Sequence, residues 1–509
     1  MKAEPTTAAA IAAMRPTVGT APGPVPLSRA DMRRTLDEAS RTVRQELTDV
    51  PLAVQGELPA ALDGVLFRNG PGRFERGGQR YAHPFDGDGH IVRLDIGPKG
   101  VRYSNRFVRT AEFVAEEAAG HMCFRGFGSN LPGGLLANLL RMRFKNAANT
   151  SVVWHAGRLL ALWEGGAPHR LDPHTLDTLG TEDFDGGLRN PLPPPARWLS
   201  RTLPFAAHPR LDAVTGELFS FGLMFGVRNR LFLYRVDRDG QMAPPRMYPL
   251  PRFSFVHDFA VTRRWLCFLL PHADFDVPRA LLGLSTPVGS LRLATERPMQ
   301  ALLIPRAGGA PRLLDCGPGF VFHIAQGFDR DDGALVLDVL RYVDYPAFDD
   351  LDTLFAASPP DSLPHLERLV LEPDTGRFDV RSWTDRGAEL PTTEPGALGG
   401  PRRLIYSIGA PRERRAPFFT AIQRLDTETG ELRVLDLAPD VPGEPIPVPA
   451  ADGGQDWLLS LVHRAGRSRT DLLVLRTSDL NIVATASLPH VVPLGFHGCW
   501  VPRAEIGSA

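Results

Sequence analysis

Four of the fourteen histidines share a local setting that could hold a metal ion. They lie in "FAAHP" (His208), "SFVHDFA" (His257), "FVFHIAQGF" (His323) and "GFHGCWVP" (His497), each among aromatic or small apolar neighbours. Imidazole is a good ligand for iron, copper, nickel and zinc. Four neutral imidazoles fill part of an octahedron and leave adjacent positions open, as an oxygen-activating iron requires. Taken singly, each is more often a packed core histidine, so the hypothesis depends on the set being brought together.

The surrounding chain reads as many short strands joined by turns. Glycine (49) and proline (48) are abundant, and turn residues bound apolar runs such as "GVLFRNG", "WLCFLLP" and "ALVLDVLRY". A strand–turn–strand pattern with Asp, Thr and Gly in the turn recurs loosely from His169 to Leu435, as in "HRLDPHTLDTLG" and "QRLDTETGELRVL". Such repeated hairpins are typical of a sandwich array or a β-propeller. In a propeller the inner strand of each blade lines the axis, where one histidine per inner strand would meet the others.

Composition limits the alternatives. The 509 residues carry a net charge of −1, with 43% hydrophobic and 23% charged residues, as expected of a soluble globular protein. This balance gives no electrostatic support to nucleic-acid binding. The four separated cysteines form no C-x-x-C pair, which argues against a disulfide framework or a cysteine zinc site and suits a reducing cytoplasm. No apolar run approaches the roughly 20 residues that span a bilayer.

The start of the chain differs from the rest. Residues 1–27 are expected to be a flexible tail, because a weakly apolar, alanine-rich patch is followed by proline-rich sequence. "SRADMRRTLDEASRTVRQEL" then predicts a helix that Ser28 caps, with Asp31 in its first turn. No internal linker is evident, so residues 28–509 are expected to form one domain. The stretch "HPFDGDGH" suggests a metal loop but lacks the length and closing glutamate of an EF-hand.

From about Pro51 to Pro502 the chain resembles the carotenoid cleavage oxygenase family. The resemblance rests on many motifs in order, namely "GVLFRNGPGRFE", "HPFDGDGHIVRL", "NRFVRT", "NTSVVWHAGRLLALWEGG", "RLDPHTLDTLG", "AHPRLDAVTGELFSFG", "FVHDFAVT", "FHIAQGF" and "GFHGCWVP". It implies an all-β fold, a single seven-bladed β-propeller with an N-terminal helix and a helical and loop cap over an axial iron site. It implies one Fe(II) per chain, held by His208, His257, His323 and His497.

The resemblance also assigns supporting residues. Glu164 in "ALWEGG", Glu389 in "GAELP" and Glu444 in "GEPIPV" match glutamates that bond to three of the ligating imidazoles. A carboxylate that accepts the outer N–H fixes the tautomer and orientation of the ring. Thr150 in "ANTSVV" matches the position whose side chain crowds an open site on the iron. In the family "HPFDGDGH" is a structural turn, and we expect the same here.

The family cleaves a C=C bond with O2 as co-substrate and forms two carbonyl products. We therefore expect an apocarotenoid or carotenoid dioxygenase. An apolar tunnel would bind the polyene, and matching to the family places there Phe74, Trp163, Phe255, Phe322 and Tyr342. Ordinary core packing is the alternative for each of these aromatics. Trp163 stands where the stilbene-cleaving branch carries a lysine that binds the substrate's phenol, which favours a polyene.

Three other functions stay open. A stilbenoid dioxygenase would use the same scaffold, and a retinoid isomerase-type member would keep the iron but consume no O2. A non-enzymatic propeller used as a binding platform would hold no metal and would tolerate His257→Ala.

Because polyenes dissolve in membranes, an apolar patch on the surface is expected. "LPGGLLANLLRMRFKN" has leucines in a helical rhythm followed by Arg141, Arg143 and Lys145, which suits a helix at the lipid interface whose basic residues meet lipid headgroups. Its membrane-facing residues would be Leu135, Leu136, Leu139 and Leu140. "RALLGLSTPVGSL" is a second candidate, and a helix packed on the propeller is the alternative. We expect a cytoplasmic protein with peripheral contact on the inner face of the membrane, without a nucleic-acid partner or an obligatory protein partner.

Overall fold

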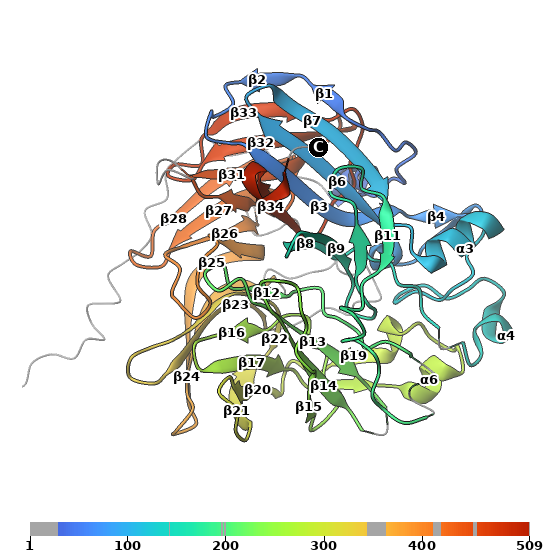
Figure 1. Ribbon diagram of the computed structural model, residues 1–509, viewed down its shortest axis with the longest axis vertical. Helices are drawn as coiled ribbons and strands as arrows, with labels where there is room; N and C mark the ends of the chain where they lie inside the picture. Colours follow the sequence, from blue (N-terminus) through green and yellow to red (C-terminus); the bar gives the residue numbers. More distant parts are fainter. Residues whose placement is uncertain are drawn as a thin grey trace, which may run out of the picture.

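The computed structural model describes residues 29–141, 143–194, 197, 200–226, 228–343, 363–410, 419–450 and 456–507. Within these residues the chain is dominated by strands, and the sheets are arranged around a common centre near which β8, β12, β25 and β34 lie (Figure 1). The predicted tail at residues 1–27 and the predicted cap Ser28 lie outside the described residues.

Four of the large sheets follow one another from the N-terminus. The first has the order β1 (Val50–Leu52), β7 (Gly100–Phe107), β6 (Asp88–Gly97), β3 (Gly64–Arg73) and β34 (Gly498–Pro502). The second contains β11 (Thr178–Thr181), β10 (His169–Leu171), β9 (Arg158–Leu162) and β8 (Ser151–His155). The third contains β12 (Arg210–Leu211), β13 (Leu218–Met224), β14 (Arg230–Val236) and β15 (Arg246–Pro249). The fourth contains β16 (Ala260–Val261), β17 (Trp265–Leu270), β20 (Pro298–Pro305) and β21 (Arg312–Pro318).

The remaining strands form two larger sheets and two small ones. The seven-stranded sheet runs β22 (Phe320–Asp329), β23 (Leu335–Tyr342), β24 (His365–Glu372), β25 (Arg377–Thr393), β26 (Leu404–Gly409), β27 (Ala421–Asp426) and β28 (Leu432–Asp436). The six-stranded sheet contains β2 (Val54–Gly56), β33 (Ile482–Ser487), β32 (Arg469–Arg476), β31 (Trp457–Arg464), β29 (Val441–Pro442) and β30 (Ile446–Val448). The small ribbons are β4 (Glu75–Arg76) with β5 (Gln79–Arg80), and β18 (Ala273–Phe275) with β19 (Leu291–Leu293). The predicted hairpins, such as β10–β11 and β27–β28, are confirmed.

The seven-stranded sheet is two blades that share the long strand β25. Its first part pairs with β24 up to Gly387, and its second part pairs with β26 from Ala388 onward. The described sheets therefore make seven blades, and the predicted all-β propeller is confirmed. The ring closes twice, because C-terminal β34 pairs with β3 of the first blade and N-terminal β2 pairs with β33 of the last.

The core is divided among the gaps between neighbouring blades. Along β17, Trp265 and Cys267 pack with residues of the fifth blade, whereas Leu266 and Phe268 pack with residues of the third. Alternate side chains of a strand point to opposite faces of the sheet, so a blade packed on both sides needs apolar residues at every position. This is why the strands read as continuous apolar runs such as "WLCFLL".

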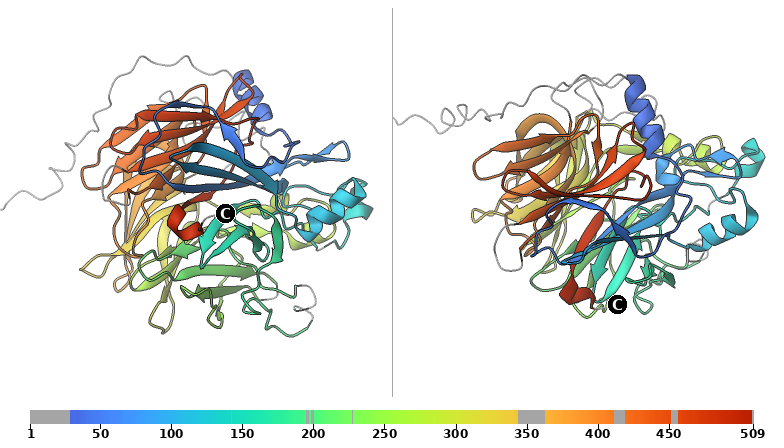
Figure 2. Two further views of the ribbon diagram at one scale, coloured as in Figure 1. Left: turned by 45° about the horizontal axis from the view of Figure 1, so that its top comes forward. Right: turned by 90° about the horizontal axis from the view of Figure 1, so that it is seen from above.

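Helices are short and lie outside the blades. In the described part of the chain they are α2 (Arg29–Ala39), η1 (Pro84–Asp86), α3 (Ala111–Ala119), α4 (Gly134–Asn138), α6 (Val277–Leu281), η2 (Val288–Ser290) and α8 (Arg503–Ile506). The right-hand view of Figure 2 shows α2 (blue) and α8 (red) on opposite sides of the propeller. The loops with α3, α4 and α6 are described below where they bear on the site.

Two helix predictions are wrong in extent. The N-terminal helix ends at Ala39, because the next segment pairs with the first blade: Val43 N donates to Gly72 O at 2.8 Å and Leu47 N to Asn105 Oδ1 at 2.7 Å. These backbone groups are satisfied by the sheet rather than within a helix.

The leucine-rich helix predicted within Leu131–Asn146 is limited to α4. The Asn138 side chain exchanges hydrogen bonds of 2.8 Å with both backbone groups of Leu131 and closes a compact turn. Leu140 then adopts a left-handed φ of 56°, which ends any helical path.

Candidate metal centre

The four predicted histidines come from the axial ends of four different blades. His208 lies just before β12, His257 just before β16, His323 within β22, and His497 directly before β34. Each of these strands is the first or last of its sheet. Propeller closure therefore brings together residues that are far apart in the chain.

The imidazoles converge on one point. One nitrogen atom of each of the four rings lies within 4.8 Å of the corresponding nitrogen of the other three. Nε2 of His208 is 2.9 Å from Nε2 of His257, and the rings of His208 and His497 have centroids 4.3 Å apart. His208 is half-buried and the other three are buried. Among the described residues this is the one group of three or more His, Cys, Asp or Glu side chains close enough to share an ion.

Three glutamates contact the outer nitrogen of three of these rings. The pairs are His323 Nδ1 with Glu389 Oε2 at 2.5 Å, His497 Nδ1 with Glu444 Oε1 at 2.7 Å, and His257 Nδ1 with Glu164 Oε1 at 2.7 Å. The first two pairs are hydrogen bonds, and the last is an ion-pair contact. Because an ionised carboxylate only accepts, each Nδ1 carries the proton and each Nε2 lone pair is left for the centre.

The glutamates are held in their ionised form. Burial by itself would raise the pKa of Glu164, Glu389 and Glu444, but the imidazole beside each carboxylate acts together with the other donors around it and keeps the pKa below the ordinary value. Burial lowers the pKa of His208 well below its ordinary value, and the neighbouring imidazoles lower it further. His208 is therefore neutral and can offer a lone pair.

The residues present fit a metal ion. Nε2 of His323 is buried and has no hydrogen-bond partner. A buried polar atom in this state is destabilising by about 1–3 kcal/mol, and a cation at the centre would use its lone pair. Imidazole nitrogens suit iron, copper, nickel and zinc, whereas Mg²⁺ and Ca²⁺ prefer oxygen.

Thr150 lies next to the histidine cluster, immediately before β8. Its backbone carbonyl accepts a hydrogen bond from His497 N at 3.2 Å, and its hydroxyl donates to Asn149 Oδ1 at 3.3 Å. The side chain is buried. That it crowds an open position on the metal stays a prediction.

Aromatic rings continue outward from His257. The ring of Phe322 lies 4.2 Å from the imidazole of His257, centroid to centroid, and Phe255 lies 6.2 Å from Phe322. The ring centroid of Phe320 lies 5.6 Å from that of Phe322 and 6.0 Å from that of Tyr342. We call Phe255, Phe320, Phe322 and Tyr342 the aromatic cluster.

The structure adds aromatic residues that the sequence did not single out. Phe320 lies two residues before Phe322 on β22, and rings extend from Phe255 through Phe127 and Phe85 to Phe496. Alternation along β22 could have indicated Phe320, and Phe496 directly precedes His497.

Two predicted tunnel residues have no ring contact with the aromatic cluster in the described part of the chain. Among the described residues, the ring contacts do not join Phe74 or Trp163 to it. Phe74 is buried, and the Trp163 ring packs so closely on Gly165 that a Cβ there would approach it to 2.5 Å. Their place in a tunnel stays a prediction.

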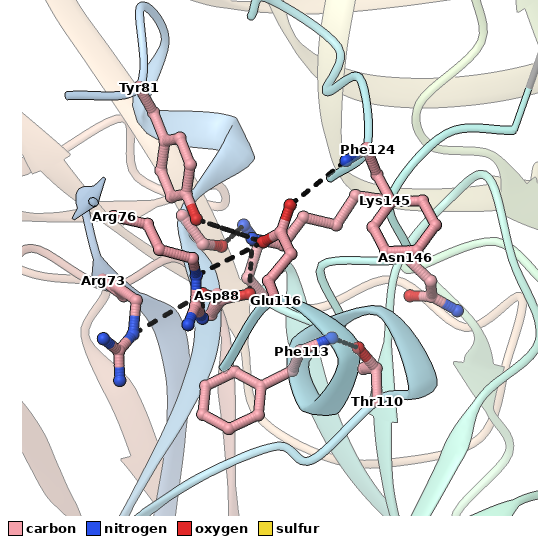
Figure 3. Close-up of polar contacts among 12 residues, drawn as sticks. Arg73, Arg76, Tyr81, Asp88, Thr110, Phe113, Glu116, Phe124, Lys145 and Asn146 are labelled. Atoms are coloured by element: carbon pink, nitrogen blue, oxygen red, sulfur yellow. Dashed lines mark hydrogen bonds and ion pairs between the residues drawn. The ribbon is translucent and has the colours of Figure 1, made fainter. Parts of the chain in front are cut away.

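The "HPFDGDGH" stretch joins a buried network of charges (Figure 3). Asp88 pairs with Lys145 at 2.5 Å and with Arg76 at 3.1 Å, and Lys145 Nζ also donates to Glu116 at 3.0 Å and to the Tyr81 hydroxyl at 2.9 Å. We call these five residues the lysine network. The side chains of Lys145, Asp88 and Glu116 are at most 3% exposed. The prediction that Lys145 meets lipid headgroups is therefore wrong, because α3 and β6 enclose it.

Asp86 has a structural place in the same stretch. Its carboxylate accepts hydrogen bonds from the backbone N–H of Phe127 at 2.5 Å and of Gly128 at 3.0 Å. Burial raises the pKa of Asp86 to about 6, although these hydrogen bonds oppose the rise. The stretch thus fastens the loop after α3 to the propeller.

A β-propeller with four axial imidazoles, three of them supported by glutamates, defines a class of metal-dependent propeller proteins. The family described as "Retinal pigment epithelial membrane protein" matches residues 40–502. Apocarotenoid-15,15'-oxygenase of Synechocystis is 34% identical, over 88% of this chain and 92% of its own length. Isoeugenol monooxygenase of Pseudomonas nitroreducens is 28% identical, over 89% of this chain and 94% of its own length.

Solved structures agree with these relatives. The crystal structure of cobalt-substituted Synechocystis apocarotenoid oxygenase superimposes with a TM-score of 0.84 at 32% identity, covering 93% of this chain and 99% of that chain. The chain belongs to this family, the carotenoid cleavage oxygenases, and is an oxidoreductase. The family contains non-haem iron oxygenases, and the four-histidine cluster fits an iron site.

Proposed function

We propose that the protein is a non-haem Fe(II) dioxygenase that cleaves one C=C bond of an apocarotenoid or carotenoid. The reaction is R–CH=CH–R′ + O2 → R–CHO + R′–CHO, which balances without a further reductant. The observation that supports it most is the convergence of His208, His257, His323 and His497, with three Nδ1 atoms directed at glutamates.

The residues of the chain have separate tasks in this proposal. The four imidazoles would hold Fe(II), and the bound iron would supply the activation of dioxygen. Glu164, Glu389 and Glu444 keep the rings in the Nδ1–H tautomer, so that their lone pairs face the centre. The aromatic cluster would exclude water and align the polyene beside His257.

A polyene is favoured over a phenolic substrate. The position that would carry a phenol-binding lysine is Trp163. A buried lysine–tyrosine pair does exist, Lys145 with Tyr81, but Lys145 Nζ already contacts Asp88 and Glu116. The Synechocystis relative, an apocarotenoid oxygenase by name, supports the same substrate class.

A stilbenoid or phenylpropenoid alkene is the second candidate. It is supported by the isoeugenol monooxygenase of Pseudomonas nitroreducens, which matches nearly the whole chain at lower identity. Turnover of a 4-hydroxystilbene but not of any apocarotenal would select it.

Access from a membrane surface belongs to the same proposal. Leu135, Leu136, Leu139 and Leu140 are 47%, 84%, 39% and 68% exposed. Leu140 N donates to Leu281 O at 2.9 Å, which puts α4 beside α6, where Leu282 and Leu284 are also exposed. We call the exposed leucines of these two segments the leucine patch, and it would enter the headgroup region of a membrane. In the part of the chain that the structure describes, helices are too short or too polar to cross a bilayer. A cytoplasmic location on the inner face of the membrane, and a single domain over residues 28–509, stay predictions.

The decisive experiment combines metal analysis with product analysis. Protein loaded anaerobically with Fe(II) should bind one iron per chain, and O2 should then bleach an apocarotenal. Mass spectrometry of a panel of apocarotenals of graded length should show two aldehydes per substrate. His257→Ala should lose both iron and activity. Iron-loaded protein that leaves every polyene unchanged would contradict the substrate class, and product formation without O2 consumption would indicate an isomerase instead.

A further inference from the structure

The three glutamates behind the imidazoles differ in their remaining partners. Oε2 of Glu444 accepts a hydrogen bond from the Arg68 guanidinium and another, at 3.0 Å, from the N–H of Gly498. Oε1 of Glu389 receives instead the neutral hydroxyl of Tyr342 at 2.8 Å. His497 and His323 are therefore supported by carboxylates of unequal basicity, because a cationic donor withdraws more charge from a carboxylate than a hydroxyl does.

Glu389 is held rigidly between its partners. Its Oε2 accepts from His323 Nδ1 at 2.5 Å and from Leu390 N at 2.8 Å. Leu390 adopts a left-handed φ of 49°, which is unfavourable for a leucine and turns its N–H back to the carboxylate. The carboxylate is thus fixed at the His323 end, and the hydroxyl of Tyr342 acts on its other oxygen.

Tyr342 contacts both the aromatic cluster and Glu389. It is the last residue of β23, and its ring lies 6.0 Å from that of Phe320 in the aromatic cluster. The cluster reaches His257 through Phe322. A hydrocarbon that occupies the cluster would press on the same ring whose hydroxyl donates to Glu389.

We propose that Tyr342 is a positioning residue that couples occupancy of the aromatic cluster to the donor strength of His323 through Glu389. Weakening the hydroxyl–carboxylate bond leaves more negative charge on Glu389. The carboxylate then attracts the Nδ1 proton more strongly, which makes Nε2 a better donor. The inference deepens the proposed function and rests on the metal centre proposed there.

Tyr342→Phe tests this coupling, because it keeps the ring and removes only the hydroxyl. Tyr406→Phe is a matched control. Tyr406 lies on β26, and its hydroxyl donates to Glu394 Oε1 at 3.3 Å. This pair contacts none of the four histidines. Both variants and the wild type are loaded with Co(II), and their EPR spectra are recorded anaerobically with and without an apocarotenal. Kinetics with Fe(II) and O2 are measured in parallel.

The wild type and Tyr406→Phe should show a change in the Co(II) spectrum when the apocarotenal is added. The metal-only spectrum of Tyr342→Phe should already be shifted, and the apocarotenal should change it less. The kcat of Tyr342→Phe should fall by about tenfold, at the lower end of the roughly 10- to 100-fold losses typical of residues that support metal ligands. Its KM should stay within about twofold of the wild-type value.

Spectra of Tyr342→Phe that match the wild type, with and without the apocarotenal, would overturn the coupling. A raised KM with unchanged spectra would also overturn it, since Tyr342 would then only pack against the substrate. Failure of the wild type to bind Co(II) would instead contradict the metal centre itself.

Discussion

Nε2 of His208 lies 2.9 Å from Nε2 of His257, although 48 residues separate them in the chain. Both nitrogens belong to the set of four whose members all lie within 4.8 Å of one another, close enough to hold one ion. Of the two rings, His257 has the carboxylate of Glu164 at its outer nitrogen.

Removal of that carboxylate should weaken metal binding. Glu164→Ala should lower iron affinity by about 10- to 100-fold, because the His257 ring loses the partner that fixes its tautomer. Glu164→Gln should retain part of the affinity, since its amide oxygen can still face Nδ1 as an acceptor. Metal titration of the apoprotein measures both. Glu394→Gln, a glutamate that pairs with Tyr406 and not with a histidine, is the control. Wild-type affinity in Glu164→Ala would contradict the assigned role.

His90 should make the fold sensitive to acid. Burial lowers its pKa to about 3, helped by the charge of His490, and its Nε2 accepts from Asn105 Nδ2 at 2.8 Å. Between about pH 6.5 and 3 the unfolded chain therefore binds the proton that the folded protein excludes. The free energy of unfolding therefore falls as the pH is lowered through this window. The loss between pH 7 and pH 5 is about 2 kcal/mol.

His90→Gln tests this, because glutamine can accept the same hydrogen bond without titrating. Urea unfolding at pH 7 and pH 5 should show a smaller loss of stability in the variant than in the wild type. Parallel curves for the two proteins would show that His90 is not the source of the acid sensitivity.

The leucine patch should control membrane binding. Leu136→Glu combined with Leu140→Glu should reduce co-sedimentation with lipid vesicles by at least about tenfold, because each leucine buried in lipid contributes about 1.5–3 kcal/mol. Leu179→Glu on β11 removes a leucine of comparable exposure (59%) outside the patch and should bind like the wild type. Equal loss in both proteins would argue against a specific patch.

The lysine network should stabilise the packing of α3 against β6 of the first blade. Lys145→Met leaves Asp88 and Glu116 buried without their shared cation and should lower the free energy of unfolding by about 3–5 kcal/mol. Arg330→Met breaks the exposed pair with Asp332 and should leave the free energy of unfolding nearly unchanged, because solvent screens exposed pairs. Denaturant unfolding measures the free energy of unfolding of both variants and of the wild type. Similar effects of the two substitutions would contradict a structural role for the network.

Much of the architecture could be predicted because its signals are local. A hairpin such as β27–β28 is encoded by adjacent apolar runs and an Asp–Thr–Gly turn, and the Asp426 carboxylate does accept the turn's N–H groups, at 3.0 Å from Glu428 N. Two of the predictions that failed depended on distant partners. The helix stops at Ala39 because Gly72 and Asn105 compete for the following backbone, and Lys145 is buried because Asp88 and Glu116 lie around it.

The sequence by itself determined which residues could do chemistry: four histidines in apolar settings, three glutamates in recognisable motifs, and strands apolar on both faces. Only the tertiary structure decided that these imidazoles share one point and that Tyr342 reaches Glu389. The physical reason is ring closure. Pairing of β34 with β3 and of β2 with β33 sets the positions of all seven blades at once, and contacts between distant strands leave no trace in local residue patterns.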